Sequence, residues 1–361
     1  MITVTKTFFP PIEEYKAYID KIWESKWLTN NGDLTKELTG KLTEHLNANH
    51  LILMTNGTLP IQIALNAFAE QGEVITTPFS YVATTSSIVW EKCTPVFVDI
   101  HPEYLTIDET KIEQAITSKT TAILVTHVYG NPCDIEAIDA IARKYKLKVI
   151  YDAAHCFGVK YKNKPIFNYG DVSVCSFHAT KLFHTGEGGA LFCQDENTYN
   201  EMLYRHKFGH DGPLRFHGIG INAKISELQA AMGLSVLPYI DAIIQDRKRV
   251  CQLYDDLLDF KLLRRLKIRA HTEWNYSYYP IIFNSEAELL KTEKLLHSNE
   301  IVPRRYFYPS LSSLSYVNNT NDLKVSDDIA PRILCLPLYY GLENDNIKKI
   351  SELISTALGK F

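Results

Sequence analysis

The chain has 361 residues, of which 45% are hydrophobic and 22% charged, with 17 Gly and 15 Pro. These fractions are close to those of average soluble globular proteins, so they exclude a disordered, collagen-like or coiled-coil chain. With 38 Lys and Arg against 42 Asp and Glu, the net charge is −4. That balance argues against a dedicated nucleic-acid-binding protein, which would more often be basic.

In chain order, the first predicted element is a helix over residues 13–27, followed by a turn over 27–32. From about residue 50 to 195, short apolar runs alternate with amphipathic stretches. The runs predict strands at 51–54, 74–77, 96–99, 122–128, 148–151, 172–177 and 190–193, and the amphipathic stretches predict helices at 58–68, 84–90, 111–115 and 135–145. Continuous apolar runs are typical of strands that are covered on both faces. We therefore expect an α/β fold around a mostly parallel, seven-stranded sheet.

After Ser226 the pattern changes. A long helix is predicted to about residue 258, then a strand over 276–283, a helix over 285–297, a strand over 301–305 and a final helix over 344–358 with one apolar stripe. These elements predict a large α/β domain over residues 1–240 and a smaller α+β domain over 241–361.

Seven cysteines are dispersed along the chain without any C-x-x-C pair, which favours buried reduced thiols over disulfides or a metal site. The N-terminal residues have no basic start followed by an apolar stretch, so no signal peptide is expected. No window reaches the roughly 18 consecutive apolar residues of a membrane span. The sequence therefore predicts a cytoplasmic protein with no membrane or nucleic-acid partner and no bound metal.

Three of the predicted strands end in residues that could carry chemistry. Gly57 and Thr58 lie between a strand and a helix, where N–H groups and a hydroxyl can bind a phosphate, although an ordinary helix cap would look the same. Asp152 can place a carboxylate in a site, or it can cap the next helix. Lys181 lies among apolar neighbours, which can desolvate its amine and allow a Schiff base; a solvated lysine is the alternative.

Together these groups are more informative than each is alone. Ligands bind beyond the carboxyl ends of the strands in an open parallel sheet, so the three groups are expected to meet there. A phosphate seat, a carboxylate for a pyridine nitrogen and a lysine are the requirements of a pyridoxal phosphate site. A G-x-G-x-x-A pattern at 218–223 does not follow a predicted strand, so a dinucleotide site is rejected.

The motifs around these residues resemble those of the sugar aminotransferases of the DegT/DnrJ/EryC1/StrS family, a branch of the fold-type-I pyridoxal-phosphate enzymes. The motifs are WLTNNG (27–32), NGT (56–58), TPFSYVAT (77–84), PVFVDI (95–100), HVYGNPCD (127–134), DAAHCFG (152–158), SFHATK (176–181), GEGGAL (186–191) and GIN with SELQAA (220–231). The resemblance covers nearly the whole chain. It implies a homodimer in which the partner subunit completes each active site.

The resemblance also implies roles for single residues. Lys181 is expected to form the Schiff base and to move a proton between Cα and C4′, and Asp152 to pair with the pyridine nitrogen. The other cofactor contacts implied are a histidine near the phenolic oxygen, an aromatic ring on the pyridine, and phosphate ligands that include one from the neighbouring subunit: His155, Tyr81, Gly57, Thr58, Ser176 and Asn222.

Substrate contacts are expected from the WLTNNG turn, the GEGG loop and the segment RRYFYP: Asn30, Asn31, Glu187, Arg304, Arg305 and Tyr308. The two arginines are candidates for an anionic nucleotide handle, although each could equally be a solvated surface charge. Phe307 stands where many relatives have a histidine, which in some of them belongs to the sugar pocket.

The expected reaction is a transamination in two halves, with L-glutamate as the amino donor and a nucleotide-linked keto-sugar as the acceptor. The motifs look most like those of enzymes that act at C4 of dTDP-4-dehydro-6-deoxy-D-glucose and form dTDP-4-amino-4,6-dideoxy-D-glucose for bacterial O-antigen. The alternatives are a 3-aminotransferase acting on a 3-keto isomer and a C4 enzyme that gives the galacto epimer. A protein of this fold that binds the cofactor without turnover is a further alternative.

Overall fold

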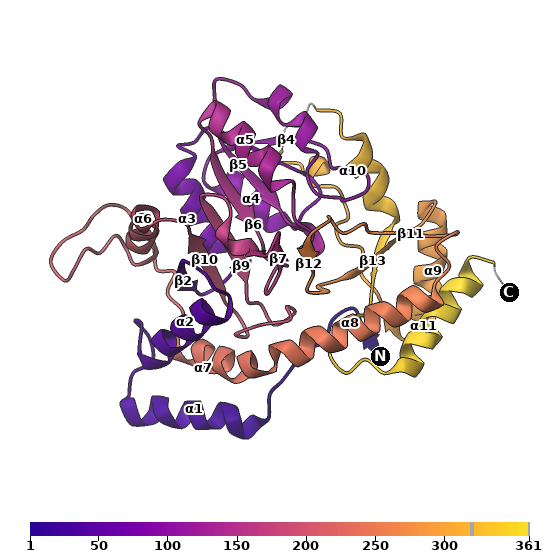
Figure 1. Ribbon diagram of the computed structural model, residues 1–361, viewed down its shortest axis with the longest axis horizontal. Coiled ribbons are helices and arrows are strands. Elements are labelled where there is room, and N and C mark those ends of the chain that lie inside the picture. The colour runs from indigo at the N-terminus through magenta and orange to yellow at the C-terminus, as the bar shows by residue number, and fades with distance from the viewer. Residues whose placement is uncertain (318–320, 360–361) are drawn as a thin grey trace.

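The central sheet has seven strands in the order β2-β10-β9-β6-β5-β3-β4 (Figure 1). This computed structural model describes residues 1–317 and 321–359. The sheet strands are β2 (His50–Met54), β3 (Glu73–Thr76), β4 (Thr94–Phe97), β5 (Thr120–Thr126), β6 (Lys148–Asp152), β9 (Val172–Ser176) and β10 (Gly189–Cys193). β10 is antiparallel to both of its neighbours, whereas the other neighbouring pairs are parallel. The predicted α/β fold class is confirmed.

Helices cover both faces of this sheet, and alternate side chains of each strand therefore enter different cores. On β5, for example, Ile123 and Val125 belong to a core with α1, α2, α5 and α7, whereas Ala122 and Leu124 belong to a core with α3, α4 and α6. These helices are α1 (Ile12–Ser25), α2 (Asp33–His45), α3 (Thr58–Phe68), α4 (Val82–Trp90), α5 (Ile135–Tyr145), α6 (Glu196–His206) and α7 (Glu227–Val236). Burial on both faces explains why the strands are continuously apolar.

The C-terminal part of the chain forms a separate core of its own. Its elements are α8 (Ile240–Leu257), β11 (Arg264–Arg265), β13 (Tyr279–Ile282), α9 (Glu286–Ser298), α10 (Lys324–Ile329), β15 (Ile333–Leu336) and α11 (Asn344–Ala357). β11, β13 and β15 form an antiparallel sheet, and α8, α9 and α11 pack with it. Short strands complete the structure: β1 (Ile2–Thr3) with β14 (Ile301–Val302), and β7 (Lys160–Tyr161) with β8 (Lys164–Pro165) and β12 (Thr272–Glu273).

A long helix joins the two parts of the molecule. It runs from α7 through a short turn at Leu237–Tyr239 into α8, and crosses the lower half of Figure 1 from left to right above α1. Ser226 and Gln229 cap its start reciprocally, which satisfies N–H groups that would otherwise lack partners. This helix is long and apolar enough to cross a membrane by length and composition, but 56% of its apolar window is buried inside the protein. The domain boundary at residue 240 falls within the helix and stays a prediction.

Several elements differ from the sequence-based expectation. The helix expected at 111–115 is a pair of single 3-10 turns, Glu109–Lys111 and Glu113–Ala115. α2 and α6 were not predicted as separate helices, and the strand expected at 276–283 is shorter, at Tyr279–Ile282. The residues before it instead make side-chain contacts with the large domain. All seven cysteines are buried and reduced, as expected.

Candidate active site

A cavity lies at the carboxyl ends of β2, β6 and β9, where an open parallel sheet places its ligands. The large domain lines it with residues that follow these strands or precede α4, and the C-terminal part lines it with two segments. The lining residues include Asn56, Gly57, Thr58, Tyr81, Asp152, His155, Ser176, His178, Lys181 and Glu187 from the first, and Tyr278, Arg304, Tyr306 and Phe307 from the second. The predicted groups at the three strand ends therefore share one cavity.

The turn after β2 is held against the end of β9. A Cβ atom added to Gly57 would lie 2.8 Å from Ser176 Cβ, so only glycine allows this approach. The Asn56 side-chain oxygen accepts hydrogen bonds from the N–H groups of Thr58 and Leu59, both at 2.9 Å. Those two donors are already satisfied, which corrects the expectation that they are free. The groups left for an anion in this corner are the glycine main chain and nearby hydroxyls.

Asp152 ends β6 and is 4% exposed. Thr84 Oγ1 donates a hydrogen bond to its Oδ2 at 2.7 Å, and the Ala154 N–H donates to its Oδ1 at 3.1 Å. Burial raises the pKa of Asp152, although these hydrogen bonds oppose the shift. The carboxylate is thus oriented from two sides and can accept a further hydrogen bond within the cavity.

The amine of Lys181 lies inside the same cavity. Its Nζ is 3.2 Å from the hydroxyl oxygen of Tyr278. Burial lowers the pKa of Lys181, against smaller opposing effects of Tyr306 and Asp152. A lowered pKa makes the neutral, nucleophilic amine more accessible near neutral pH.

His155 is held as a neutral imidazole. Its Nδ1 accepts a hydrogen bond from the Tyr129 N–H at 3.1 Å, so the proton lies on Nε2. Burial, with a smaller effect of Lys181, holds the pKa of His155 well below its usual value. The ring is parallel to that of Phe307, with 5.9 Å between the centroids and 2° between the planes. His155 can therefore donate one hydrogen bond from Nε2.

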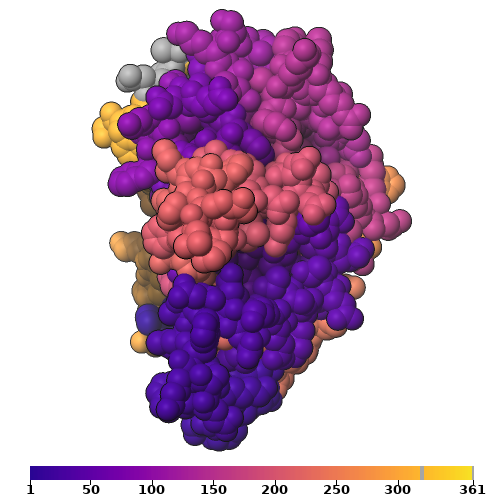
Figure 2. Space-filling view, turned by 90° about the vertical axis from the view of Figure 1, so that its left-hand side faces the viewer, coloured from indigo at the N-terminus to yellow at the C-terminus, as the bar shows by residue number. Residues whose placement is uncertain are grey.

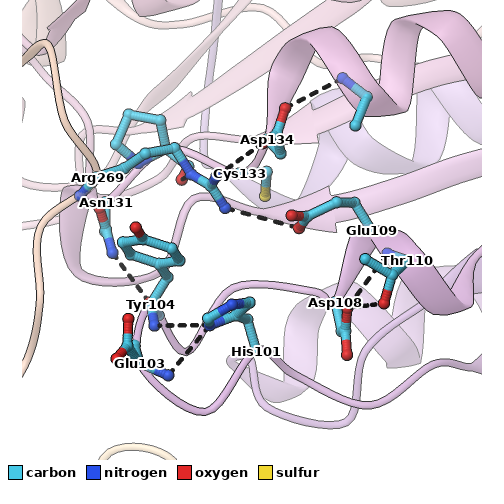
Figure 3. A network of polar contacts seen from close by, with 12 residues as sticks. His101, Glu103, Tyr104, Asp108, Glu109, Thr110, Asn131, Cys133, Asp134 and Arg269 are labelled. Carbon is cyan, nitrogen blue, oxygen red and sulfur yellow. Dashed lines mark hydrogen bonds and ion pairs between the residues drawn. The ribbon is translucent and has the colours of Figure 1, made fainter.

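A polar cluster centred on Arg269 supports the segment that carries Tyr129. Figure 3 shows the Arg269 side chain between Asp134 and Glu109, at 2.8 Å and 3.6 Å. The Arg269 N–H also donates to Asn131 Oδ1 at 2.8 Å. Because Arg269 lies in the chain between β11 and β12, this cluster joins the C-terminal part to the large domain close to the cavity.

The other predicted site residues do not line this cavity. The Arg305 guanidinium donates to Glu286 and to the Pro331 carbonyl, both at 2.6 Å, and lies 3.6 Å from the ring of Tyr308. The structure therefore places the Arg305 charge in an ion pair rather than beside the cavity. Asn222 lies on the segment between α6 and α7, where its oxygen accepts from Lys224 Nζ at 2.5 Å.

Asn30 and Asn31 form a turn before α2, both with left-handed backbone angles. The first turn of α2, which follows it, is held by Glu227, a buried carboxylate to which sequence reasoning gave no role. Glu227 accepts hydrogen bonds from the N–H groups of Leu34 at 2.8 Å and Thr35 at 3.1 Å. A helix N-terminus favours a carboxylate in this position.

Sequence reasoning also missed Thr84, Tyr278 and Tyr306. Thr84 ends the TPFSYVAT motif, which offered a signal for it. Tyr278 belongs to an aromatic run that we interpreted as strand packing, and its contact with Lys181 spans 97 positions. Among the described residues, no group of three or more His, Cys, Asp or Glu side chains is arranged to hold a metal ion.

Comparisons with known proteins agree with this geometry. Residues 11–355 match the DegT/DnrJ/EryC1/StrS aminotransferase family. The dTDP-4-amino-4,6-dideoxy-D-glucose transaminase of Shigella dysenteriae is 41% identical over 359 residues, which cover 98% of each chain. The Escherichia coli protein of the same name is 40% identical over 373 residues, which cover 100% of this chain and 99% of that one. The structure of DesI with its TDP-sugar product superposes with a TM-score of 0.93 at 28% identity and covers 99% of this chain and 93% of DesI.

These matches place the chain among the aminotransferases. More particularly, it belongs to the DegT/DnrJ/EryC1/StrS aminotransferase family. The predicted family and enzyme class are confirmed, as is pyridoxal phosphate as the cofactor. The residues present fit this cofactor: the cavity holds an amine with a lowered pKa, a buried carboxylate and a glycine corner that a Cβ atom would fill.

Proposed function

We propose that this chain transfers the amino group of L-glutamate to C4 of dTDP-4-dehydro-6-deoxy-D-glucose and forms dTDP-4-amino-4,6-dideoxy-D-glucose. The observation that carries the proposal is the meeting of Lys181 and Asp152 in one cavity at the strand ends. Two relatives that bear the name of this transaminase are 40% and 41% identical over nearly the full chain, which supports this acceptor.

The positions of the cavity residues support the cofactor contacts that the family resemblance implies. Gly57, Thr58 and Ser176 would hold the phosphate, Asp152 would accept a hydrogen bond from a protonated ring nitrogen, and the Nε2–H of His155 would donate to the phenolic oxygen. Tyr81 is 52% exposed at the cavity, where its ring is free to cover the pyridine. When bound, pyridoxal phosphate supplies an aldehyde for amines and a ring that takes up electrons from Cα.

The proton transfers are assigned to Lys181. Its neutral amine takes the proton from Cα of glutamate and returns a proton on the other side of the transferred nitrogen, as a general base and then a general acid. In the second half of the reaction, Lys181 carries out the same proton transfers on the sugar in the reverse order. Asp152 keeps the ring nitrogen protonated throughout, which its buried and hydrogen-bonded position supports.

The anionic handle of the nucleotide sugar is assigned to Arg304, which lines the cavity and lies over the Tyr306 ring at 4.6 Å. Glu187, 3.6 Å from His178 Nε2, is assigned to the sugar side. The Asn30–Asn31 turn and Tyr308 would contact substrate only if the partner subunit or a shift of the chain brought them to the cavity. Arg305 is not assigned to the anionic handle, because its guanidinium forms an ion pair with Glu286.

A homodimer with shared active sites is part of the proposal. The segment between α6 and α7, here called the arm (residues 207–226), extends from the large domain and leaves large apolar side chains in solvent, among them Leu214 (91% exposed), Phe216 (69%) and Ile219 (84%). Figure 2 faces this side, where the arm (salmon) lies above the N-terminal residues (indigo). Exposed apolar patches favour a protein interface, and Asn222 on the arm would reach the partner's phosphate site. We place the enzyme in the cytoplasm, in O-antigen synthesis.

Colour provides the first test. Purified protein with pyridoxal phosphate is expected to absorb in the visible, to bleach when glutamate is added and to recover with dTDP-4-dehydro-6-deoxy-D-glucose. The ring couplings of the product, measured by NMR, then give the position and orientation of the amine. A protein that stays colourless with the cofactor would overturn the proposal, and an axial C4 amine or a C3 amine would replace its product with one of the alternatives.

Mixing two inactive variants tests the shared site. Lys181→Ala and Asn222→Ala proteins, unfolded and refolded together, should regain activity, because every mixed dimer would contain one intact site. Each variant refolded alone is the control. A monomeric mass by light scattering would contradict the dimer.

A further inference from the structure

A buried tyrosine from the C-terminal part of the chain contacts the amine of Lys181 directly. Tyr278 is 5% exposed, and its hydroxyl oxygen lies 3.2 Å from Lys181 Nζ. Its ring packs against the ring of His155, with 4.8 Å between the centroids and 61° between the planes. The hydroxyl is therefore part of the cavity wall and lies at the atom that the proposed reaction uses.

The main chain on the N-terminal side of Tyr278 is fixed from two directions. Asn275, which is 1% exposed, donates from Nδ2 to the carbonyl of His155 at 2.9 Å. Arg247, a buried side chain of α8, donates from Nε to the carbonyl of Tyr276, also at 2.9 Å. These contacts anchor the segment both to the loop after β6 and to the long helix. The Tyr278 hydroxyl is thus a fixed point, whereas the lysine stem is flexible.

A second, smaller cavity adjoins this pair and is lined by Lys181 and Tyr278 together with Thr180 and Ser277. The amine of Lys181 therefore lies between the two cavities, within hydrogen-bond distance of the Tyr278 hydroxyl. A lysine amine without such a partner would instead sample many positions.

We propose that Tyr278 is a catalytic residue whose hydroxyl holds the free amine of Lys181 where it exchanges protons with Cα of the amino acid. This inference rests on the proposed transaminase function. The hydroxyl accepts a hydrogen bond from the ammonium form and donates one to the neutral form, so it serves both states of the lysine. Burial raises the pKa of Tyr278 and keeps the phenol neutral. The proton moves only between Nζ and carbon, and no bond to Tyr278 forms or breaks.

Tyr278→Phe tests this role because it removes the hydroxyl and keeps the ring. The matched control is Tyr276→Phe on the same segment, whose ring packs on Trp274 at 4.8 Å, away from the cavity. We expect kcat to fall about 10- to 100-fold in Tyr278→Phe, while the KM for glutamate changes less than about twofold. This loss in kcat is at or below the lower end of the range for general acid–base catalysis. The isotope effect with 2-deuterated glutamate should rise, and the control should match the wild type.

A second measurement uses the full-length protein without cofactor. Cyanate labels neutral amines, so the rate of Lys181 labelling against pH, followed by peptide mass, reports the protonation of Lys181. A charge-assisted hydrogen bond is stronger than a neutral one, so loss of the hydroxyl costs the ammonium more than the amine. The profile of Tyr278→Phe should therefore shift to lower pH than that of the wild type and of Tyr276→Phe.

A labelling profile that does not move, or a kcat within twofold of the wild type, would overturn the role of Tyr278. If Tyr278→Phe fails to fold, 3-fluorotyrosine at position 278 keeps the ring and alters the hydroxyl, and it must shift the profile or the proposal fails. Labelling does not depend on turnover. A wild-type protein that glutamate fails to bleach would therefore overturn the transaminase function, which is a separate outcome.

Discussion

The two sides of the cavity are built differently. On the large-domain side, Gly57, Asp152 and Lys181 each lie at or just beyond a strand end. The hydrogen bonds that fix the turn around Gly57 and the carboxylate of Asp152 come from the same part of the chain. On the other side, Tyr278 and Arg304 reach the cavity from the C-terminal part, and the segment before Tyr278 is tied to the first side by Asn275, which donates to the carbonyl of His155, 120 positions away. In the proposed function, the first side supplies the cofactor contacts and the proton carrier, and the second supplies the hydroxyl that holds the lysine amine and the guanidinium for the anionic handle. Variants on the two sides should therefore fail in different ways.

The largest effect is expected for Lys181→Ala. Loss of the amine removes the proton carrier, so the single-turnover rate with glutamate should fall by about 10⁴-fold or more, while the melting temperature stays close to that of the wild type. Stopped-flow absorbance measures the rate. Lys164→Ala, at an exposed lysine over the Tyr169 ring, is the control. Bleaching within tenfold of the wild-type rate would remove Lys181 from the proposed mechanism.

The Asp152→Asn variant should lower activity but raise the stability of the cofactor-free protein at pH 7. We expect kcat to fall by about 10²- to 10³-fold, since a neutral amide does not favour a protonated ring nitrogen. Because burial raises the folded-state pKa of Asp152, its contribution to stability is present at low pH and is lost as the pH rises through that pKa.

The cofactor-free Asn variant should therefore be more stable than the wild type at pH 7, and this difference should shrink toward pH 4. Urea unfolding at a series of pH values measures it. A variant less stable than the wild type at pH 7 would contradict the assigned cost of burying this carboxylate.

Arg269→Ala tests the connection between the two sides. Its removal leaves Asp134 and Glu109 without their buried partner, so the free energy of unfolding should fall by about 3 kcal/mol, with kcat changed less than tenfold. Lys267→Ala is the matched control, because it breaks an exposed ion pair with Glu103 at 2.7 Å and should cost less than about 1 kcal/mol. Equal losses in the two variants would show that the Arg269 cluster does not join the two parts.

Gly57→Ala should have the smallest effect of the four. The new methyl group must displace Ser176, so affinity for pyridoxal phosphate is expected to fall about tenfold, which corresponds to about 1.4 kcal/mol. Fluorescence titration measures the affinity. Gly40→Ala in α2 offers a control, since nothing lies within 4 Å of an added Cβ there. Unchanged affinity in Gly57→Ala would move the phosphate site away from this corner.

The difference between the two sides also sets what the sequence could predict. Gly57, Asp152 and Lys181 follow apolar runs within a few residues, so their placement at one edge follows from the parallel sheet alone. Tyr278 lies among other tyrosines that suit a strand equally well, and no local pattern tells which ring faces another part of the chain. The same limit explains Arg305, whose ion pair with Glu286 depends on how α9 packs. α2 was missed because its N-terminus is capped by Glu227, 192 or more positions away in sequence.

The buried cysteines have a practical consequence. All seven are buried, and burial raises the pKa of each thiol, so little reactive thiolate exists in the native fold. They are also distributed between the cores of both parts of the molecule, with Cys175 on β9 of the central sheet and Cys251 on α8. The rate at which each thiol becomes alkylated would therefore report local opening at its own position. The chain carries a built-in set of probes that can tell whether its two parts unfold together or one after the other.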